Sequence, residues 1–137
     1  MKTRIYFIII LLILVVPAFS QTEKTADLKE VSKATEISFL ETEYDFGTVK
    51  SGGDAIHYFV FLNTGSDPLV ISNVRTSCGC AVPEWPKAPV GSGTKDSLRV
   101  EYNTRIKGAF DKTIMVYTND AKGMIELRIK GNVVKEK

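Results

Sequence analysis

The feature that most constrains the fold of this chain is a two-residue alternation of apolar and polar side chains that recurs from residue 37 onward. In the run 98–102 every second residue is apolar, and the run 124–130 repeats the pattern. A period of two places successive side chains on opposite faces of a β-strand, whereas a helix needs an apolar stripe with a period of 3.6 residues. No convincing stripe of the second kind occurs. The pattern therefore favours a domain built of β-strands.

Two of the runs carry more detailed predictions. The run Ile56–Asn63 is apolar at both parities, which is typical of a central strand that is covered on one face and partly shielded on the other. In the run that starts at Leu69, the apolar spacing slips by one residue between Ile71 and Val74. Such a slip predicts a β-bulge or a bend at that point.

Clusters of turn-forming residues separate the runs. They are Gly52-Gly53, Asn63–Pro68, Gly91–Gly93, Gly108, Asn119-Asp120 with Gly123, and Gly131-Asn132. About seven short strands with such turns between them are typical of an immunoglobulin-like β-sandwich, here expected over residues 37–137, and a β-barrel is the alternative. No widely spaced Cys pair bridges the sheets, so the core must hold by packing. The candidate core residues are Phe46, Phe59, Phe61, Leu69, Ile71, Val100, Phe110, Ile114, Leu127 and Ile129.

The N-terminal segment has the three parts of a secretory signal peptide. Met1–Arg4 is positively charged, Ile5–Val16 is an unbroken run of twelve apolar residues, and Ala18-Phe19-Ser20 offers small residues where a signal peptidase cleaves. Twelve residues are too few to span ~30 Å of hydrocarbon as a helix, so an uncleaved membrane anchor is the weaker alternative. We therefore expect residues 1–20 to be a signal peptide and the mature protein to be exported, periplasmic or extracellular, without membrane insertion.

The segment that follows is polar, and the mature chain is electrically balanced. Residues 21–36 are expected to form a flexible leader, with a short N-terminal helix as the alternative. The net charge of +2 comes from Lys2 and Arg4 in the signal peptide, so the mature chain has no net charge. A protein without surplus positive charge has no electrostatic basis for binding nucleic acid, and we expect no nucleic-acid partner.

Cys78-Gly79-Cys80 is the one motif with evident chemical potential. Gly79 permits unusual backbone angles, so the two thiols are expected to approach each other closely. Three interpretations stay open. The pair could form a small, strained disulfide that exchanges with other thiols, it could bind Cu(I) as two soft thiolates, or it could be a structural turn that packs against the sandwich.

Two further residues are candidates for a site near the Cys pair. Counting along the strands on either side of the 63–68 turn places His57 toward the same pole as the Cys pair, which makes it a candidate third metal ligand, with a purely structural His as the alternative. The stretch Pro83–Pro89 holds three prolines and is expected to form a rigid loop or edge that covers this pole. Within it, Trp85 is a candidate either for plugging the end of the core or for anchoring a partner.

No catalytic motif accompanies these residues. The sequence lacks a G-x-S-x-G elbow, a phosphate-binding Gly-rich loop and a His-x-x-x-His pair. We therefore expect a protein that is not an enzyme and has no cofactor. Weak thiol–disulfide activity at Cys78 and Cys80 is the alternative, and Cu(I) is the alternative ligand.

A set of short motifs occurs in order across the domain. They are Tyr44–Val49, Gly52, His57–Gly65, Pro68–Ile71, Ser77–Cys80, Trp85, Gly108 with Phe110, and Thr118-Asn119. In this combination the chain resembles the bacterial family called domain of unknown function 1573, over residues 37–133. It departs from the family at Ala81, where Thr is frequent. The resemblance implies a small exported protein whose sandwich is similar to those of the major-sperm-protein and cilia-associated type, which act as binding modules.

Two functions are expected from the sequence. The first is a non-catalytic protein-binding module of the cell envelope, which engages an unidentified protein partner through its edge strands or through the end that carries the Cys pair and Trp85. The second is a small protein that exchanges thiols and disulfides, or handles Cu(I), through Cys78-Gly79-Cys80.

Overall fold

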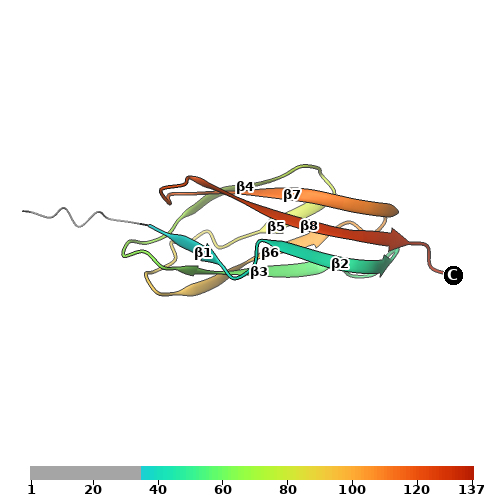
Figure 1. The fold of residues 1–137 in the computed structure, drawn as a ribbon, viewed down its shortest axis with the longest axis horizontal. Coiled ribbons are helices and arrows are strands. Elements are labelled where there is room, and N and C mark those ends of the chain that lie inside the picture. Colours follow the sequence, from blue (N-terminus) through green and yellow to red (C-terminus); the bar gives the residue numbers. More distant parts are fainter. Residues whose placement is uncertain (1–34) are drawn as a thin grey trace, which may run out of the picture.

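A computed structural model describes residues 35–137 and shows eight β-strands in two layers (Figure 1). The strands are β1 (Ile37–Phe39), β2 (Glu43–Lys50), β3 (Ile56–Asn63), β4 (Ile71–Thr76), β5 (Ala81–Glu84), β6 (Lys95–Tyr102), β7 (Gly108–Thr118) and β8 (Met124–Val134). The predicted signal peptide and residues 21–34 of the predicted leader lie outside the described residues. Within residues 35–137, no helix is long and apolar enough to span a membrane.

The strands form two four-stranded sheets that pack face to face. The first sheet has the order β1-β3-β6-β5 and is antiparallel throughout. The second has the order β2-β8-β7-β4, with β2 parallel to β8 and the other pairs antiparallel. The predicted all-β, immunoglobulin-like sandwich is therefore confirmed, with eight strands in place of about seven.

β5 is a strand that the sequence pattern did not delimit. It contains Pro83, and prolines in this stretch predicted a loop or edge without ladder bonds. An edge strand pairs on one side only, so it tolerates a proline that a central strand would reject. Residues 81–84 pair with β6 in an unbroken register from Ala81–Tyr102 to Glu84–Arg99. The bulge predicted in the run after Leu69 is confirmed, because the β4–β7 register shifts between Ile71 and Asn73.

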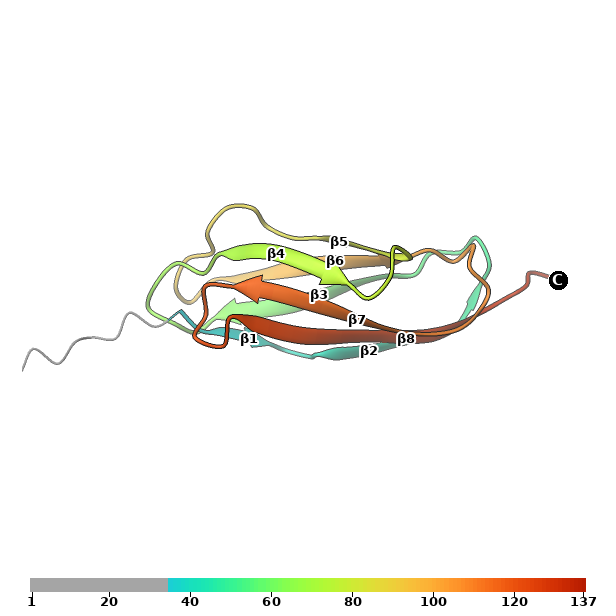
Figure 2. The same cartoon turned by 90° about the horizontal axis from the view of Figure 1, so that it is seen from above.

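The chain passes between the two sheets along both long sides of the sandwich (Figure 2). On one side β1 is the edge of the first sheet, and the chain continues through Leu40–Thr42 into β2, the edge of the second. On the other side β4 is the edge of the second sheet, and the chain continues through Ser77–Cys80 into β5, the edge of the first. Each long side is therefore closed by one short crossing.

The core lies between the inward-facing residues of the two sheets. Nine of the ten candidate core residues are buried, and Phe46 is the exception because it lies on edge strand β2, where it is half-buried against the core. Buried residues that the candidate set lacked include Leu98, Val116 and Tyr102. Their alternating positions on β6 and β7 follow the same period of two that placed the others.

One end of the sandwich is fixed by buried polar side chains. Asn63 is fully buried, and its Nδ2 donates to the carbonyls of Asp67 at 2.8 Å and Val90 at 2.9 Å. Asp120 is also buried, and its carboxylate accepts a hydrogen bond from the amide of Ile37 at 3.0 Å. Buried polar groups with full sets of partners specify one arrangement of the surrounding turns.

Close packing at Gly131 gives a test of the core. A Cβ at this position would lie 2.8 Å from Cζ of Phe110 and 3.1 Å from the carbonyl oxygen of Gly47. The Phe110 ring is stacked on Tyr102 with centroids 3.7 Å apart, so it has little room to retreat. Gly131→Ala is expected to lower the free energy of unfolding by about 1–3 kcal/mol in urea denaturation. The exposed neighbour Asn132→Ala is expected to change it by less than about 0.5 kcal/mol, and equal effects would contradict this packing.

Candidate functional site

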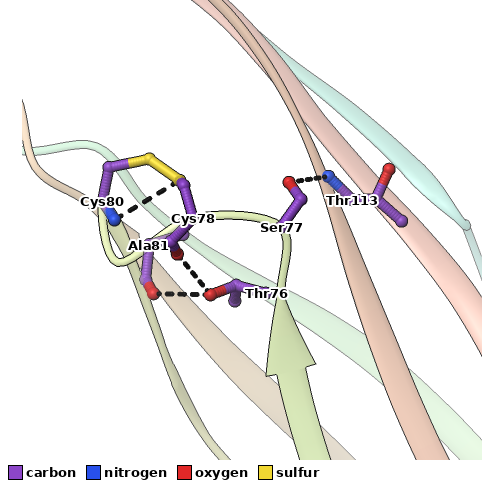
Figure 3. Close-up of a disulfide and its surroundings, with 6 residues drawn as sticks. All are labelled: Thr76, Ser77, Cys78, Cys80, Ala81 and Thr113. Carbon is purple, nitrogen blue, oxygen red and sulfur yellow. Dashed lines mark hydrogen bonds between the residues drawn. A yellow bond between two sulfur atoms is a disulfide. The ribbon is translucent and has the colours of Figure 1, made fainter.

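The Cys pair lies on the crossing between β4 and β5. Cys78 and Cys80 form a disulfide, with their Cα atoms 5.3 Å apart (Figure 3). On the second sheet the crossing sits on a long side of the sandwich and not at its pole, because Thr76, the last residue of β4, pairs with Ile114 in the middle of β7. The expectation of a turn at the end of the sandwich therefore holds for the first sheet, where Ala81 pairs with Tyr102 at the end of β6, and not for the second, since β4 is shorter than β7.

Hydrogen bonds hold both ends of this turn independently of the disulfide. The Ser77 amide donates to the Thr113 carbonyl at 2.9 Å, and the Thr113 amide donates to Ser77 Oγ at 3.1 Å. The Asn103 amide donates to the Cys80 carbonyl at 2.8 Å. Thr76 Oγ1 lies 2.5 Å from the Cys78 carbonyl and donates to it, which ties the start of the turn to its centre. The backbone of the turn is thus anchored to β7 on one side and to the end of β6 on the other.

Gly79 is not required by the backbone of the turn. Its φ is outside the left-handed region that five other glycines of the described chain adopt, and a Cβ built on it meets no atom within 4 Å. The expectation that Gly79 supplies an unusual φ is therefore wrong. What Gly79 does provide is an uncovered approach, because no side chain stands over the turn between the two cysteines.

The two sulfurs of the disulfide are not equivalent. Cys80 is buried, with 8% of its surface exposed, whereas Cys78 is half-buried. The Cys80 amide lies 3.3 Å from Cys78 Sγ and donates to it. In Figure 3 the disulfide lies on the side of the turn away from Thr76. Cys78 is therefore the more exposed of the two residues, and its sulfur receives a backbone hydrogen bond.

His57 belongs to the packing of the opposite long side. Its ring stacks on Tyr44 of β2 with centroids 3.6 Å apart and meets Phe59 edge-on at 4.7 Å. Its Nε2 donates to Glu41 Oε1 at 2.7 Å, on the crossing between β1 and β2. His57 thus connects the first sheet to the second at this crossing, which is a structural role.

The structure does not bring His57 and the Cys pair into one site. His57 and Pro83 both pair with Val100, so they lie toward the same end of the first sheet with β6 between them, roughly 10 Å apart. No group of three or more His, Cys, Asp or Glu side chains among residues 35–137 is placed to hold a metal ion. Cu(I) binding by the Cys pair alone needs both sulfurs as thiolates, so it stays a prediction for the reduced protein.

Trp85 follows β5 directly and packs against the core from the side, not from the pole. It is half-buried, its Nε1 is buried without a hydrogen-bond partner, and Lys87 Nζ lies 3.0 Å from the ring centroid. A ring covered by a cation on its outer face and by the core on the other contributes mainly to packing. The stretch 83–89 therefore covers a long side of the sandwich. The expectation that it covers the pole is wrong.

A second surface was not singled out by the sequence. Five large apolar side chains are exposed among residues 35–137, and Leu40, Tyr58 and Val82 lie on or beside the outer face of the first sheet. The run 56–63 gave a partial signal, since both its parities are apolar. Val82 and Leu40 gave none, because their exposure depends on which strands become edges.

Charged residues lie beside these apolar residues on the same face, namely Arg99 and Glu101 of β6 and Glu84 of β5. Arg99 pairs with Tyr58 on one side and with Glu84 on the other. Its guanidinium donates to Glu101 Oε2 at 2.7 Å and lies 3.6 Å from Glu84 Oε2. The hydrogen bond to Glu101 is the main reason why the pKa of Arg99 is raised. The Arg99 side chain is therefore held in one orientation next to Tyr58.

The packing of His57 predicts the effect of removing it. His57→Ala eliminates the stack on Tyr44 and the hydrogen bond to Glu41, and is expected to lower the free energy of unfolding by about 1–3 kcal/mol in urea denaturation. Thr48→Ala, an exposed change on the same side, serves as the control. A His57→Ala effect no larger than that of the control would contradict the structural role.

The small ring of the disulfide predicts a small effect on stability. Only Gly79 separates the two cysteines, so the bond restricts little of the unfolded chain, and the loop-entropy relation gives about 1.5 kcal/mol. Oxidised and reduced protein are expected to differ by no more than about 2 kcal/mol in free energy of unfolding, measured by urea denaturation with and without reductant. Unfolding of the domain on reduction would contradict this expectation.

The comparisons with known proteins bear on the family and the fold. A family model described as a protein of unknown function (DUF1573) matches residues 37–133. No curated protein matches the sequence. A protein of unknown function from Porphyromonas gingivalis W83 is 18% identical with a TM-score of 0.62 over 72% of this chain, and the match spans 46% of that protein.

Two further solved structures share the fold. The seventh PapD-like (ASH) domain of human CEP192 is 10% identical with a TM-score of 0.63, over 77% of this chain and 89% of that domain. The YadV chaperone is 13% identical with a TM-score of 0.51, over 75% of this chain and 53% of the chaperone. Identities this low show a common fold alone. The family match runs from the first residue of β1 to Val133, one residue before the end of β8, over the range that the ordered motifs predicted. The chain therefore belongs to the DUF1573 family, and its domain is a PapD-like, immunoglobulin-like β-sandwich.

Proposed function

We propose that this protein is an exported, non-catalytic protein-binding module of the cell envelope, and that it binds its protein partner through the outer face of the first sheet. The observation that carries the proposal is the group of exposed apolar side chains on that face. The signal-peptide pattern of residues 1–20 supports export, and the zero net charge of the mature chain supports a partner other than nucleic acid.

The apolar group follows β3 and the end of β1, and Val82 lies apart from it on edge strand β5, beyond β6. Tyr58 is 53% exposed, Val82 on β5 is 55% exposed, and Leu40 after β1 is 67% exposed. The outward residues Ile56 and Val60 of β3 are half-buried and lie between them. Exposed apolar side chains on one face beside charged residues, here Arg99 and Glu101 of β6, are typical of a protein-binding surface.

The residue types at the centre of the face also support binding. Tyr58 and Arg99 are cross-strand neighbours, and Tyr and Arg are among the residues that contribute most to protein interfaces. Arg99 is already fixed by Glu101 and Glu84, so little side-chain freedom would be lost when a partner binds. A preordered Arg beside an exposed Tyr therefore supports a contact centre at this point.

The similar structures support the proposal only in a general way. One of them is named a chaperone, and another is a PapD-like domain of a larger protein. These names describe those proteins. Only the name chaperone refers to an action on other proteins, so the surface used in this chain is argued from its own residues.

Site-specific photo-crosslinking tests the proposal directly. A photoreactive phenylalanine analogue at position 58 or 82 of the full chain, expressed in its native envelope, is expected to capture one and the same protein. The analogue at position 124 is the matched control, because Met124 is 42% exposed but lies on the second sheet. Capture of the same proteins from all three positions, or of none from positions 58 and 82, would contradict the proposal.

Binding to the captured partner then gives the energetic test. Tyr58→Ala removes an exposed aromatic side chain from the centre of the face and is expected to weaken binding at least about tenfold. Met124→Ala is expected to leave the affinity within about twofold. Isothermal titration calorimetry with the purified partner measures both, and equal affinities for the two variants would place the contact elsewhere.

A further inference from the structure

We propose that the Cys78–Cys80 disulfide is a thiol–disulfide exchange site, in which Cys78 is the sulfur that exchanges with the thiols of another protein and Cys80 is the partner that leaves and returns. This proposal goes beyond the binding module and rests on different residues, on the opposite side of the first sheet from β1.

The disulfide is not needed to shape the turn. Ser77 is bonded to Thr113 through two hydrogen bonds, and the Cys80 carbonyl accepts from the Asn103 amide. The Thr76 hydroxyl lies 2.5 Å from the Cys78 carbonyl and 3.4 Å from the Ala81 carbonyl at the far end of the turn. A disulfide that closes a ring over a single residue adds little to a backbone that is already anchored at both ends. Its presence at this crossing therefore calls for a role other than stability.

The turn leaves the Cys78 end of the disulfide accessible, since Ser77 and Gly79 are exposed and Cys78 is half-buried, whereas Cys80 packs in the core. The turn lies between two edge strands, β4 and β5, and not beneath another strand. Gly79 has no side chain to cover the turn. The space beside it is also free, since a Cβ built there would meet no atom within 4 Å. An attacking thiolate must reach a sulfur in line with the bond that breaks, and of the two cysteines Cys78 is the one that is not buried.

The difference between the two sulfurs fixes the direction of attack. Cys78 is half-buried and Cys80 is buried, so a thiolate from outside reaches Cys78 Sγ first. A substrate thiolate that attacks Cys78 Sγ forms a mixed disulfide with it, and the Cys78–Cys80 bond breaks. The electron pair of that bond leaves with Cys80, which takes a proton from water.

The second step completes a two-electron exchange. A second thiolate of the substrate attacks the substrate sulfur of the mixed disulfide, a substrate disulfide forms, and Cys78 leaves as a thiolate. The backbone amide of Cys80, which donates to Cys78 Sγ at 3.3 Å, stabilises that negative charge. The substrate dithiol is oxidised, the Cys78–Cys80 disulfide is reduced to a dithiol, and no other reactant is required.

Single-cysteine variants of the full-length protein test the assignment of roles. Cys80→Ser leaves Cys78 alone, and Cys78→Ser leaves Cys80 alone. With an aromatic disulfide reagent at pH 8, the Cys80→Ser variant is expected to react at least about tenfold faster than the Cys78→Ser variant. Equal rates, or a faster Cys78→Ser variant, would overturn the assignment. Urea denaturation of both variants checks that each is folded, and the reagent needs no protein partner, so the result is independent of the proposed binding face.

Exchange of the native disulfide is tested without any substitution. Oxidised wild-type protein is incubated with excess reduced glutathione at pH 7, free thiols are alkylated, and the fraction reduced is measured by mass spectrometry. The proposal predicts that the disulfide is reduced while the near-ultraviolet circular dichroism stays native. A disulfide that resists glutathione until the domain is unfolded by urea would identify a structural bond and overturn the proposal.

Discussion

The constraint on which the rest of this structure depends is that the chain must pass between two packed sheets along both long sides of the sandwich. The core forms only if the inward residues of β3 and β6 meet those of β7 and β8. Each passage must therefore be short, and it must place an edge strand of one sheet beside an edge strand of the other. The residues around the two crossings decide which surfaces remain free.

The two crossings are stabilised by different chemistry. At the crossing between β1 and β2, the His57 ring of the first sheet stacks on Tyr44 of the second and donates a hydrogen bond to Glu41. Side-chain contacts therefore stabilise this crossing. Between β4 and β5, backbone hydrogen bonds from Thr113 and Asn103 hold the turn from outside. The first crossing therefore depends on a half-buried ring. The second leaves its disulfide free to take part in chemistry.

The period-two alternation was sufficient to predict a β-sandwich, several of its strands and most of its core, because inward and outward residues differ in polarity along these strands. It could not predict β5, because Pro83 is tolerated only at an edge and edges depend on the pairing of distant strands. The parallel pairing of β2 with β8 and the exposure of Val82 also depend on the pairing of distant strands, so the alternation could not predict them. The Cys pair was found from its spacing, but its position on a long side followed from the length of β4 relative to β7.

The central claim is that the β4–β5 crossing keeps its shape when the disulfide opens, so that the bond is available for exchange without unfolding. Amide hydrogen exchange measured by NMR on oxidised and reduced protein tests this claim most directly, with the amides of Ser77, Asn103 and Thr113 as reporters. The account predicts that these amides keep their protection after reduction. Loss of protection at all three upon reduction, with the rest of β6 and β7 unchanged, would show that the disulfide holds the turn and would contradict the account.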